Sequence, residues 1–178
     1  IVILPMMATP VAIALVWTMM FHPQLGVLNY LLSVVGLPPS LWVFDQGSVI
    51  PSLVMVETWQ WTPLVMLIVL GGLAAIPTEP YESARIDGAS FWQMFRYITL
   101  PGLYHIIGVV LLLTTIQTAN AFEPVYLLTG GGPSDATVVY TMLVYQVGML
   151  NLRLGEAAAV STLFLPLLVG LVLMVTVL

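Results

Sequence analysis

Long apolar segments are the feature that most constrains what this chain can fold into. Four stretches consist mainly of aliphatic and aromatic residues, and together they hold one charged side chain, Glu57: residues 1–21, 49–76, 102–122 and 157–178. A helix that crosses a bilayer needs about 20 predominantly apolar residues, so each stretch is long enough. The sequence therefore predicts an all-α, polytopic transmembrane protein in which these four stretches are the spans.

The scarcity of charge points to the same environment. Of the 178 residues, 60% are hydrophobic and 6% are charged, whereas about a quarter of the residues in an average soluble domain are charged. Eight acidic and three basic residues give a net charge of −5, which disfavours contact with the phosphates of nucleic acids. These numbers exclude a soluble enzyme, a nucleic-acid-binding protein and a disordered chain.

Two residue types are missing from the sequence, and each absence excludes a chemistry. Without cysteine, the chain has no disulfide, no thiolate nucleophile and no cysteine metal site. Without lysine, it cannot form a phosphate-binding P-loop, so we expect any ATP to be bound by a partner chain. The sequence also begins and ends inside apolar runs that lack a signal-peptide pattern. We therefore expect an internal piece of a longer membrane protein.

Three polar connections join the apolar segments: residues 22–48, 77–101 and 123–156. The central connection holds Arg85 and Arg96, two of the three arginines of the chain. Because cationic residues in short loops favour the cytoplasmic side of a membrane, we expect this connection in the cytoplasm and the other two outside. Arg153, in the third connection, counts against that orientation.

The central connection has the pattern of a helix–turn–helix elbow. A first short helix over about 79–87 ends at Gly88, which readily supplies the left-handed conformation that follows a helix. Ser90 with Gln93 has the spacing of a capping box, which starts a second short helix that runs to about residue 97. This second helix carries Phe91, Trp92 and Phe95. The aromatic side chains fit either an elbow that lies in the lipid headgroups or a docking knob for a soluble partner.

The same connection resembles the EAA loop of ABC importer permeases. The matching residues are Glu82-Ser83-Ala84, Gly88, Ile98 and Leu100-Pro101, with Ser83 where the family usually has alanine. The run Ile86-Asp87-Gly88-Ala89 resembles the carbohydrate-importer branch of that family.

Other segments extend the resemblance to essentially the whole chain. Those that are similar to maltose- and glycerol-phosphate-type subunits are Thr58-Trp59 with Pro63, Leu73 to Pro77, Leu128-Thr129-Gly130-Gly131-Gly132-Pro133 with Thr137, and Gly155 to Ala159. The resemblance implies a type I ABC importer permease fold, of which this chain would hold the last four of about six core helices.

The resemblance also implies a transport subunit that has no catalytic residues and binds no cofactor or metal of its own. In this family the loop docks on a separate ATPase subunit, which binds ATP and Mg²⁺. The residues that we expect to couple the two subunits are Glu82, Ser83, Ala84, Asp87, Gly88, Phe91 and Trp92.

The function that the resemblance implies is to form half of a translocation pathway for a sugar or oligosaccharide. The implied partners are a second permease subunit in a heterodimer, two ATPase subunits and an extracytoplasmic sugar-binding protein. The implied location, in contact with lipid, is the plasma (inner) membrane of a bacterium or archaeon.

Two polar stripes mark a candidate substrate pathway. In residues 49–76 the spacing i, i+3, i+4, i+7 places Glu57, Gln60, Trp61 and Leu64 on one helix face, and in residues 102–122 it does the same for Thr114, Gln117, Thr118 and Ala121. Polar side chains inside a bilayer are costly and tend to face a protein interior or a water-filled path. The stripes fit the walls of a sugar-binding cavity. They also fit hydrogen bonds that join packed helices.

Glu57 leaves several alternatives open. Its carboxylate could bind substrate, pair with another group, remain protonated, or lie structurally at a water-exposed cavity mouth. A proton-coupled secondary transporter would also need such a group, and this is the alternative function that we consider.

The remaining features predict local structure. Pro5 and Pro10 break the first apolar segment, at a kink or a gate hinge. The glycines of 130–132 suggest a tight turn rather than a phosphate cradle, because no lysine follows them. The apolar stretch 27–35 suits a helix at the membrane interface, and the stretch 137–150 is too short to span.

Overall fold

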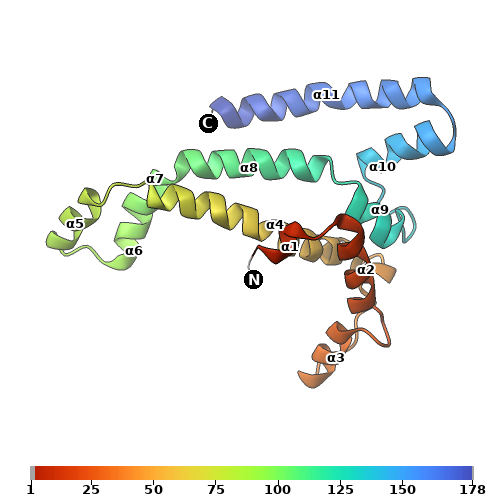
Figure 1. The fold of residues 1–178 in the computed structure, drawn as a ribbon, viewed down its shortest axis with the longest axis horizontal. Coiled ribbons are helices and arrows are strands. Elements are labelled where there is room, and N and C mark those ends of the chain that lie inside the picture. The colour runs from red at the N-terminus through yellow and green to blue at the C-terminus, as the bar shows by residue number, and fades with distance from the viewer. Residues whose placement is uncertain (1–2, 178) are drawn as a thin grey trace.

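The computed structural model describes residues 3–177, and all the regular secondary structure within that range is helical. Three helices form the body of the molecule: α4 (Val49–Ala74), α8 (Tyr104–Ala119) and α11 (Leu154–Val177). Helix α8 contacts both α4 and α11. An elbow that contains α5 (Glu79–Ile86) and α6 (Phe91–Met94) projects from one end of α4 and α8, and α2 (Pro10–Met20), α9 (Glu123–Thr129) and α10 (Tyr140–Tyr145) lie at the opposite end (Figure 1).

The lengths of the helices agree with a membrane protein. Helix α4 and residues Leu154–Met174 of α11 are each long and apolar enough to cross a bilayer. Residues Phe91–Gly102 and Tyr104–Ala119 form a third candidate if the pair, bent by 62°, is one span. Along α11 large apolar side chains are exposed, as with Leu163 at 77%. Such a surface suits contact with lipid or another apolar surface.

The first apolar segment differs from the single span that the sequence predicts. It forms two helices, α1 (Leu4–Met7) and the eleven-residue α2 (Pro10–Met20), of which α2 is apolar but shorter than a spanning helix. Ala8 and Thr9 between them are extended. Pro10 causes the break, because it lacks an N–H group and disfavours helical geometry in the residue before it. The predicted break at Pro10 is therefore confirmed, whereas Pro5 breaks no helix, because it lies in the first turn of α1, where proline is tolerated.

Helix α8 is also shorter than the predicted segment 102–122. At its start, Leu103 separates it from α7 (Leu100–Gly102), which contains Pro101. At its end, the Asn120 side chain donates a hydrogen bond to the Ile116 carbonyl at 2.8 Å, and the backbone then leaves the helix. A side-chain amide that binds the last turn in this way competes with helix continuation.

The end of the molecule opposite the elbow holds an aromatic core. The Trp17 and Phe21 rings of α2 and its C-cap lie 5.2 Å apart, and Phe21 lies 5.4 Å from Trp42 in η1 (Trp42–Phe44). Phe21 is fully buried. Helix α2 packs on α9 (Glu123–Thr129), so this core holds the segment after α8 beside α2.

Asn29 closes the loop that follows α2. It lies on α3 (Val27–Val34), donates to the carbonyls of Pro23 and Ser40, and accepts at 2.8 Å from the Trp42 indole N–H. The helix itself was predicted from residues 27–35. The role of Asn29 was not predicted, because its partners are distant in sequence.

The last connection folds back onto α11. Helix α10 (Tyr140–Tyr145) continues into the π-helical turn η3 (Gln146–Leu150), and both contact α11. The Tyr140 hydroxyl donates to the Val160 carbonyl at 2.6 Å, and its ring stacks on Phe164. Residues 137–150 were predicted to be too short to span a membrane, and these short helices agree with that prediction.

Candidate functional site

Two cavities flank the α4–α8 pair. The first has a volume of about 560 Å³ and the second about 800 Å³. Each of the eight predicted pathway residues lines at least one of them, and Glu57, Trp61, Gln117 and Ala121 line both. The stripes therefore face shared space, as their spacing predicts, and their part in substrate passage remains a prediction.

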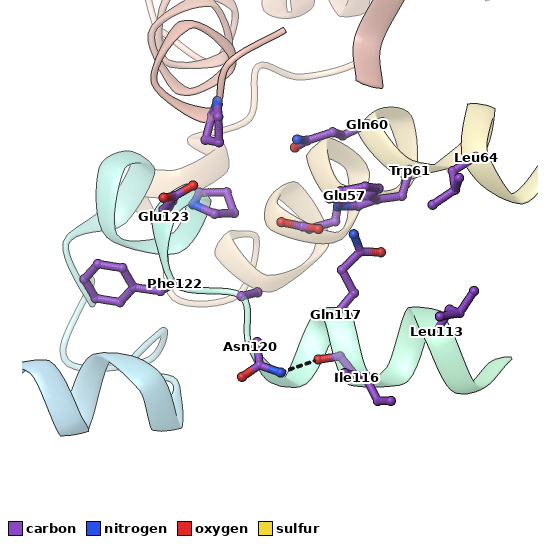
Figure 2. A pocket seen from close by; sticks show the side chains of 13 residues that line it. Glu57, Gln60, Trp61, Leu64, Leu113, Ile116, Gln117, Asn120, Phe122 and Glu123 are labelled. Atoms are coloured by element: carbon purple, nitrogen blue, oxygen red, sulfur yellow. Dashed lines mark hydrogen bonds between the residues drawn. The ribbon is translucent and has the colours of Figure 1, made fainter. Parts of the chain in front are cut away.

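Figure 2 shows how the polar groups of the first cavity are placed. Glu57 and Gln60 project from α4, and the Gln117 side chain extends from α8 towards Glu57. Gln60 is buried, and the carboxylate oxygen Oε1 of Glu57 is buried without a hydrogen-bond partner among the described residues. The Trp61 side chain interacts with the Glu57 carboxylate. Acceptor and donor groups thus remain available to a ligand beside an indole ring.

The second cavity is lined mainly by apolar residues of α4, with Thr114 and Thr118 on the α8 side. The Thr114 hydroxyl donates to the Val110 carbonyl of its own helix at 2.8 Å. Within residues 3–177, no hydrogen bond joins a stripe residue of α4 to one of α8. The contacts therefore favour cavity walls over hydrogen bonds between packed helices.

Several residues that line the first cavity were not among the predicted pathway residues: Pro10, Leu113, Ile116, Asn120, Phe122, Glu123 and Pro124. Most of them follow the end of α8 or come from α2, so helical spacing within one span could not indicate them. The Thr141 hydroxyl donates to the Ala121 carbonyl at 3.0 Å and fixes part of this segment. Glu123, in the first turn of α9, adds a second carboxylate to the cavity.

An aromatic cluster supports the same end of the cavity. Phe122 stacks on Tyr126 with ring centres 5.2 Å apart, and Tyr145 of α10 contacts both rings. A hydrogen bond with Tyr126 raises the pKa of the Tyr145 hydroxyl, and the nearby Tyr126 charge and burial add to the shift. Tyr145 therefore stays a neutral hydrogen-bonding group at physiological pH.

The elbow begins with α5 (Glu79–Ile86). As predicted, Gly88 closes this helix in the left-handed conformation. Gly88 has a φ of +76°, its N–H donates to the Arg85 carbonyl, and the Ala89 N–H donates to the Ala84 carbonyl at 2.9 Å. This pair of bonds is a Schellman motif, which closes a helix on a left-handed residue.

The second part of the elbow contains α6 (Phe91–Met94) and the π-helical turn η2 (Phe95–Thr99). The predicted capping box is present: the Ser90 N–H donates to the Gln93 side chain at 2.7 Å, and the Gln93 N–H donates to the Ser90 hydroxyl. The Trp92 ring meets both Phe91 and Phe95 edge to face. This aromatic row was predicted for the second helix of the elbow.

The predicted coupling residues form an accessible surface on the elbow. Only Ala84 is half-buried, while Glu82, Ser83, Asp87, Gly88, Phe91 and Trp92 are exposed. Large apolar side chains stand out on the elbow, because Trp92 is 73% exposed and Ile86, on α5, is 87% exposed. A patch of this composition is typical of a surface that another molecule covers. Which molecule covers it remains a prediction at this point.

The glycine-rich segment after α9 forms the predicted tight turn. Gly130 and Gly131 have φ values of +59° and +95°. The Thr129 and Thr137 hydroxyls lie 2.7 Å apart, and the Thr137 hydroxyl also donates to the Gly132 carbonyl. Thr137 is buried. These internal bonds make the segment a closed turn, as predicted.

The charged groups suggest no metal centre within residues 3–177, where no cluster of three or more metal-ligating side chains occurs. Arg153 and Glu156 form an exposed ion pair at the start of α11. Arg85 and Arg96 both lie in the elbow.

Comparison with known proteins gives a consistent result. A family model described as "Binding-protein-dependent transport system inner membrane component" matches residues 1–178. The chain is 36% identical over 168 residues to the trehalose/maltose transport system permease protein MalF of Thermococcus litoralis, covering 94% of this chain and 57% of that protein. It is 34% identical over 156 residues to the sulfoquinovosyl glycerol transport system permease protein SmoG of Agrobacterium fabrum, covering 86% and 51%.

Two solved structures share the fold. One, described as a bacterial ABC transporter involved in the import of the acidic polysaccharide alginate, has a TM-score of 0.85 and 27% identity, and covers 99% of this chain and 62% of that one. The other, an alginate transporter in complex with an alginate pentasaccharide-bound periplasmic protein, has a TM-score of 0.87, with 27% identity and coverage of 98% and 61%. These matches confirm the predicted permease fold, and the chain spans about half the length of the curated relatives named above.

Proposed function

Because this chain belongs to the family of binding-protein-dependent transport system inner membrane components, we propose that it forms half of the translocation pathway of an ATP-driven carbohydrate importer. The observation that carries the proposal is the cavity at the α4–α8 pair, where Glu57 and Gln117 present hydrogen-bonding groups beside Trp61. Family membership makes the chain a transport component of the inner membrane rather than an enzyme, as predicted.

A carbohydrate fits the chemistry of the cavity. Sugar hydroxyls can donate to the Glu57 carboxylate and exchange hydrogen bonds with the side-chain amides, while a C–H face can rest against the Trp61 ring. Relatives named for trehalose/maltose and sulfoquinovosyl glycerol support this class of cargo. An alginate importer with the same fold supports it further. The named cargoes include an acidic polysaccharide, so the relatives alone leave the charge of the cargo open.

We assign the elbow to coupling with a separate ATPase subunit. The exposed row Phe91–Trp92, together with Glu82 and Asp87 around the Gly88 turn, offers apolar and acidic contacts on one short surface. ATP and Mg²⁺ would bind to that subunit, since this chain has no lysine for a P-loop. This assignment places residues 77–101 in the cytoplasm, in agreement with their two arginines.

The proposed mechanism is alternating access. Closure of two ATPase subunits would move the elbow, which joins α4 to α8 directly through η2 and α7. A shift of α8 relative to α4 would open the cavity to one side of the membrane and close it to the other. A second permease subunit would complete the pathway, and an extracytoplasmic binding protein would deliver the sugar. A periplasmic protein is bound in one solved relative.

The alternative function, a proton-coupled secondary transporter, depends on Glu57. Family membership favours ATP-driven import over that alternative, and energy supply separates the two experimentally. Uptake by the importer should require internal ATP and persist when a protonophore removes the proton gradient. Uptake that follows the gradient and ignores ATP would refute the proposal.

Transport in proteoliposomes tests the cavity assignment. The full-length protein, its partner permease, the ATPase subunits and the binding protein are reconstituted, and uptake of radiolabelled maltose is measured. Gln117→Leu should lower uptake about tenfold, because a lost hydrogen bond that leaves a buried partner unsatisfied costs about 1–3 kcal/mol. Thr115→Val is the matched control, because Thr115 lies on α8 but lines neither cavity. Equal uptake by the two variants would refute the assignment.

A further inference from the structure

The charges around the two cavities bear on which sugars can enter. Glu57 lines both cavities, and Glu123 lines the first. Among the described residues that line either cavity, none is lysine, arginine or histidine. This chain's share of the pathway is therefore purely acidic in its formal charge.

Within the described structure, the arginines line neither cavity. Arg85 and Arg96 lie in the elbow, which projects from the end of α4 and α8 (Figure 1). Arg153 pairs with Glu156 at the start of α11. No arginine of this chain is thus placed to offset the negative charge of Glu57 within the described structure.

Trp61 interacts with the Glu57 carboxylate, but one oxygen of that carboxylate has no hydrogen-bond partner within residues 3–177. This oxygen, Oε1, is buried. Gln60, on the same face of α4, is only 7% exposed, yet its side chain lines the first cavity. Figure 2 shows Gln117 extending from α8 towards the carboxylate. A buried acceptor without a donor is costly, and a ligand hydroxyl that donates to it recovers that cost.

Given the proposed carbohydrate function, on which this step rests, we infer that the cavity takes neutral sugars and rejects acidic ones, and that Glu57 determines this selection. A neutral sugar supplies hydroxyl donors to the Glu57 carboxylate. A uronic acid or sugar phosphate places a second negative charge beside it, and their repulsion is screened far less in a cavity between apolar helices than in water.

Equilibrium binding to the assembled importer tests this inference without the selectivity of the binding protein. The full-length protein is assembled with its partner permease and ATPase subunits in nanodiscs, and dissociation constants are measured by ligand-observed NMR. The probes are maltose and the matched disaccharide in which glucuronate replaces the non-reducing glucose. The variant Glu57→Gln keeps the size and shape of the side chain and removes its charge. Glu156→Gln removes the same charge outside both cavities.

The expected result is that glucuronate weakens binding at least tenfold in the wild type and in Glu57→Asp. In Glu57→Gln the difference should fall to about threefold or less, whereas Glu156→Gln should behave like the wild type. Thermal unfolding of each assembly verifies that the variants fold. The inference is overturned if the two probes bind the wild type equally, or if Glu57→Gln leaves the tenfold difference intact. Maltose that binds but is not taken up with ATP would instead contradict the proposed function.

Discussion

The hydroxyl groups of Tyr81 and Thr99 lie 2.8 Å apart, although the residues are separated by 18 positions in the sequence. Tyr81 lies on α5, and Thr99 is the last residue of η2, directly before α7. Both side chains are half-buried. This hydrogen bond ties the first helix of the elbow to the segment that leads into α8, so we expect a displacement of α5 to move that segment.

Removal of this bond should weaken coupling more than stability. Tyr81→Phe keeps the ring and deletes the hydroxyl, and a bond of this kind contributes about 0.5–1.5 kcal/mol. We expect ATP hydrolysis by the reconstituted importer to continue while the amount of sugar taken up per ATP falls several-fold. The matched control is Tyr97→Phe, because Tyr97 is an exposed tyrosine of the same elbow. A similar change in both variants would argue against a specific link.

Substitution of the partner residue separates the hydroxyl from the volume of the side chain. Thr99→Ser retains the hydroxyl and should keep the uptake per ATP near the wild-type value. Thr99→Val retains the shape and should reproduce the loss seen with Tyr81→Phe. If Thr99→Val transports normally, the bond has no part in coupling.

Substitution at Gly88 distinguishes backbone strain from partner contact. A Cβ atom at this position would meet nothing within 4 Å, but the φ of +76° is unfavourable for other residues. Gly88→Ala should therefore cost about 1–2 kcal/mol of stability, measured by thermal unfolding of the assembled importer. Gly88→Asn should cost less, because asparagine tolerates the left-handed conformation. If the ATPase subunit packs closely here, both variants should lose ATPase binding, and normal binding by Gly88→Asn would limit the role of Gly88 to the turn.

The α4–α8 contact depends on a glycine that the sequence analysis did not single out. A Cβ atom on Gly72 would overlap the Ile106 side chain of α8, whereas the neighbouring Gly71 has open space. Gly72→Leu should destabilise the helix pair by about 1–3 kcal/mol through overpacking and lower the yield of folded protein. Gly71→Leu should have little effect, and the double variant Gly72→Ala/Ile106→Ala should be more stable than Gly72→Ala alone. Equal yields for Gly72→Leu and Gly71→Leu would contradict the close contact.

The exposed Trp92 tests the docking surface. Because its side chain is 73% exposed, Trp92→Ser should leave folding intact and reduce co-purification of the ATPase subunit about tenfold or more. Phe44→Ser provides the control, since Phe44 is also exposed and lies in η1, outside the elbow. A loss of ATPase binding in both variants would indicate general damage instead.

Local interactions explain why much of the elbow was predictable. The left-handed Gly88 and the Ser90–Gln93 capping box involve atoms within a few residues of one another, so residue type and spacing determine them. The place of the eight predicted pathway residues along the cavities was also predictable from the two stripes, because helical periodicity fixes which side chains share a face. The break at Pro10 was predictable from the chemistry of proline, but the resulting short α2 was not, because the packing of Trp17 and Phe21 holds it in place.

The sequence by itself determined that this is an apolar, all-helical membrane protein that resembles ABC importer permeases. It also determined that an elbow joins two helices, each with polar residues along one face. Only the tertiary structure added Glu123 to the cavity that Glu57 and Gln117 line, and joined Tyr81 to Thr99. The physical reason is the range of the interactions. Helix propensity, caps and periodicity act over one or two turns, whereas a cavity wall or a link between helices depends on how residues far apart in the chain pack together.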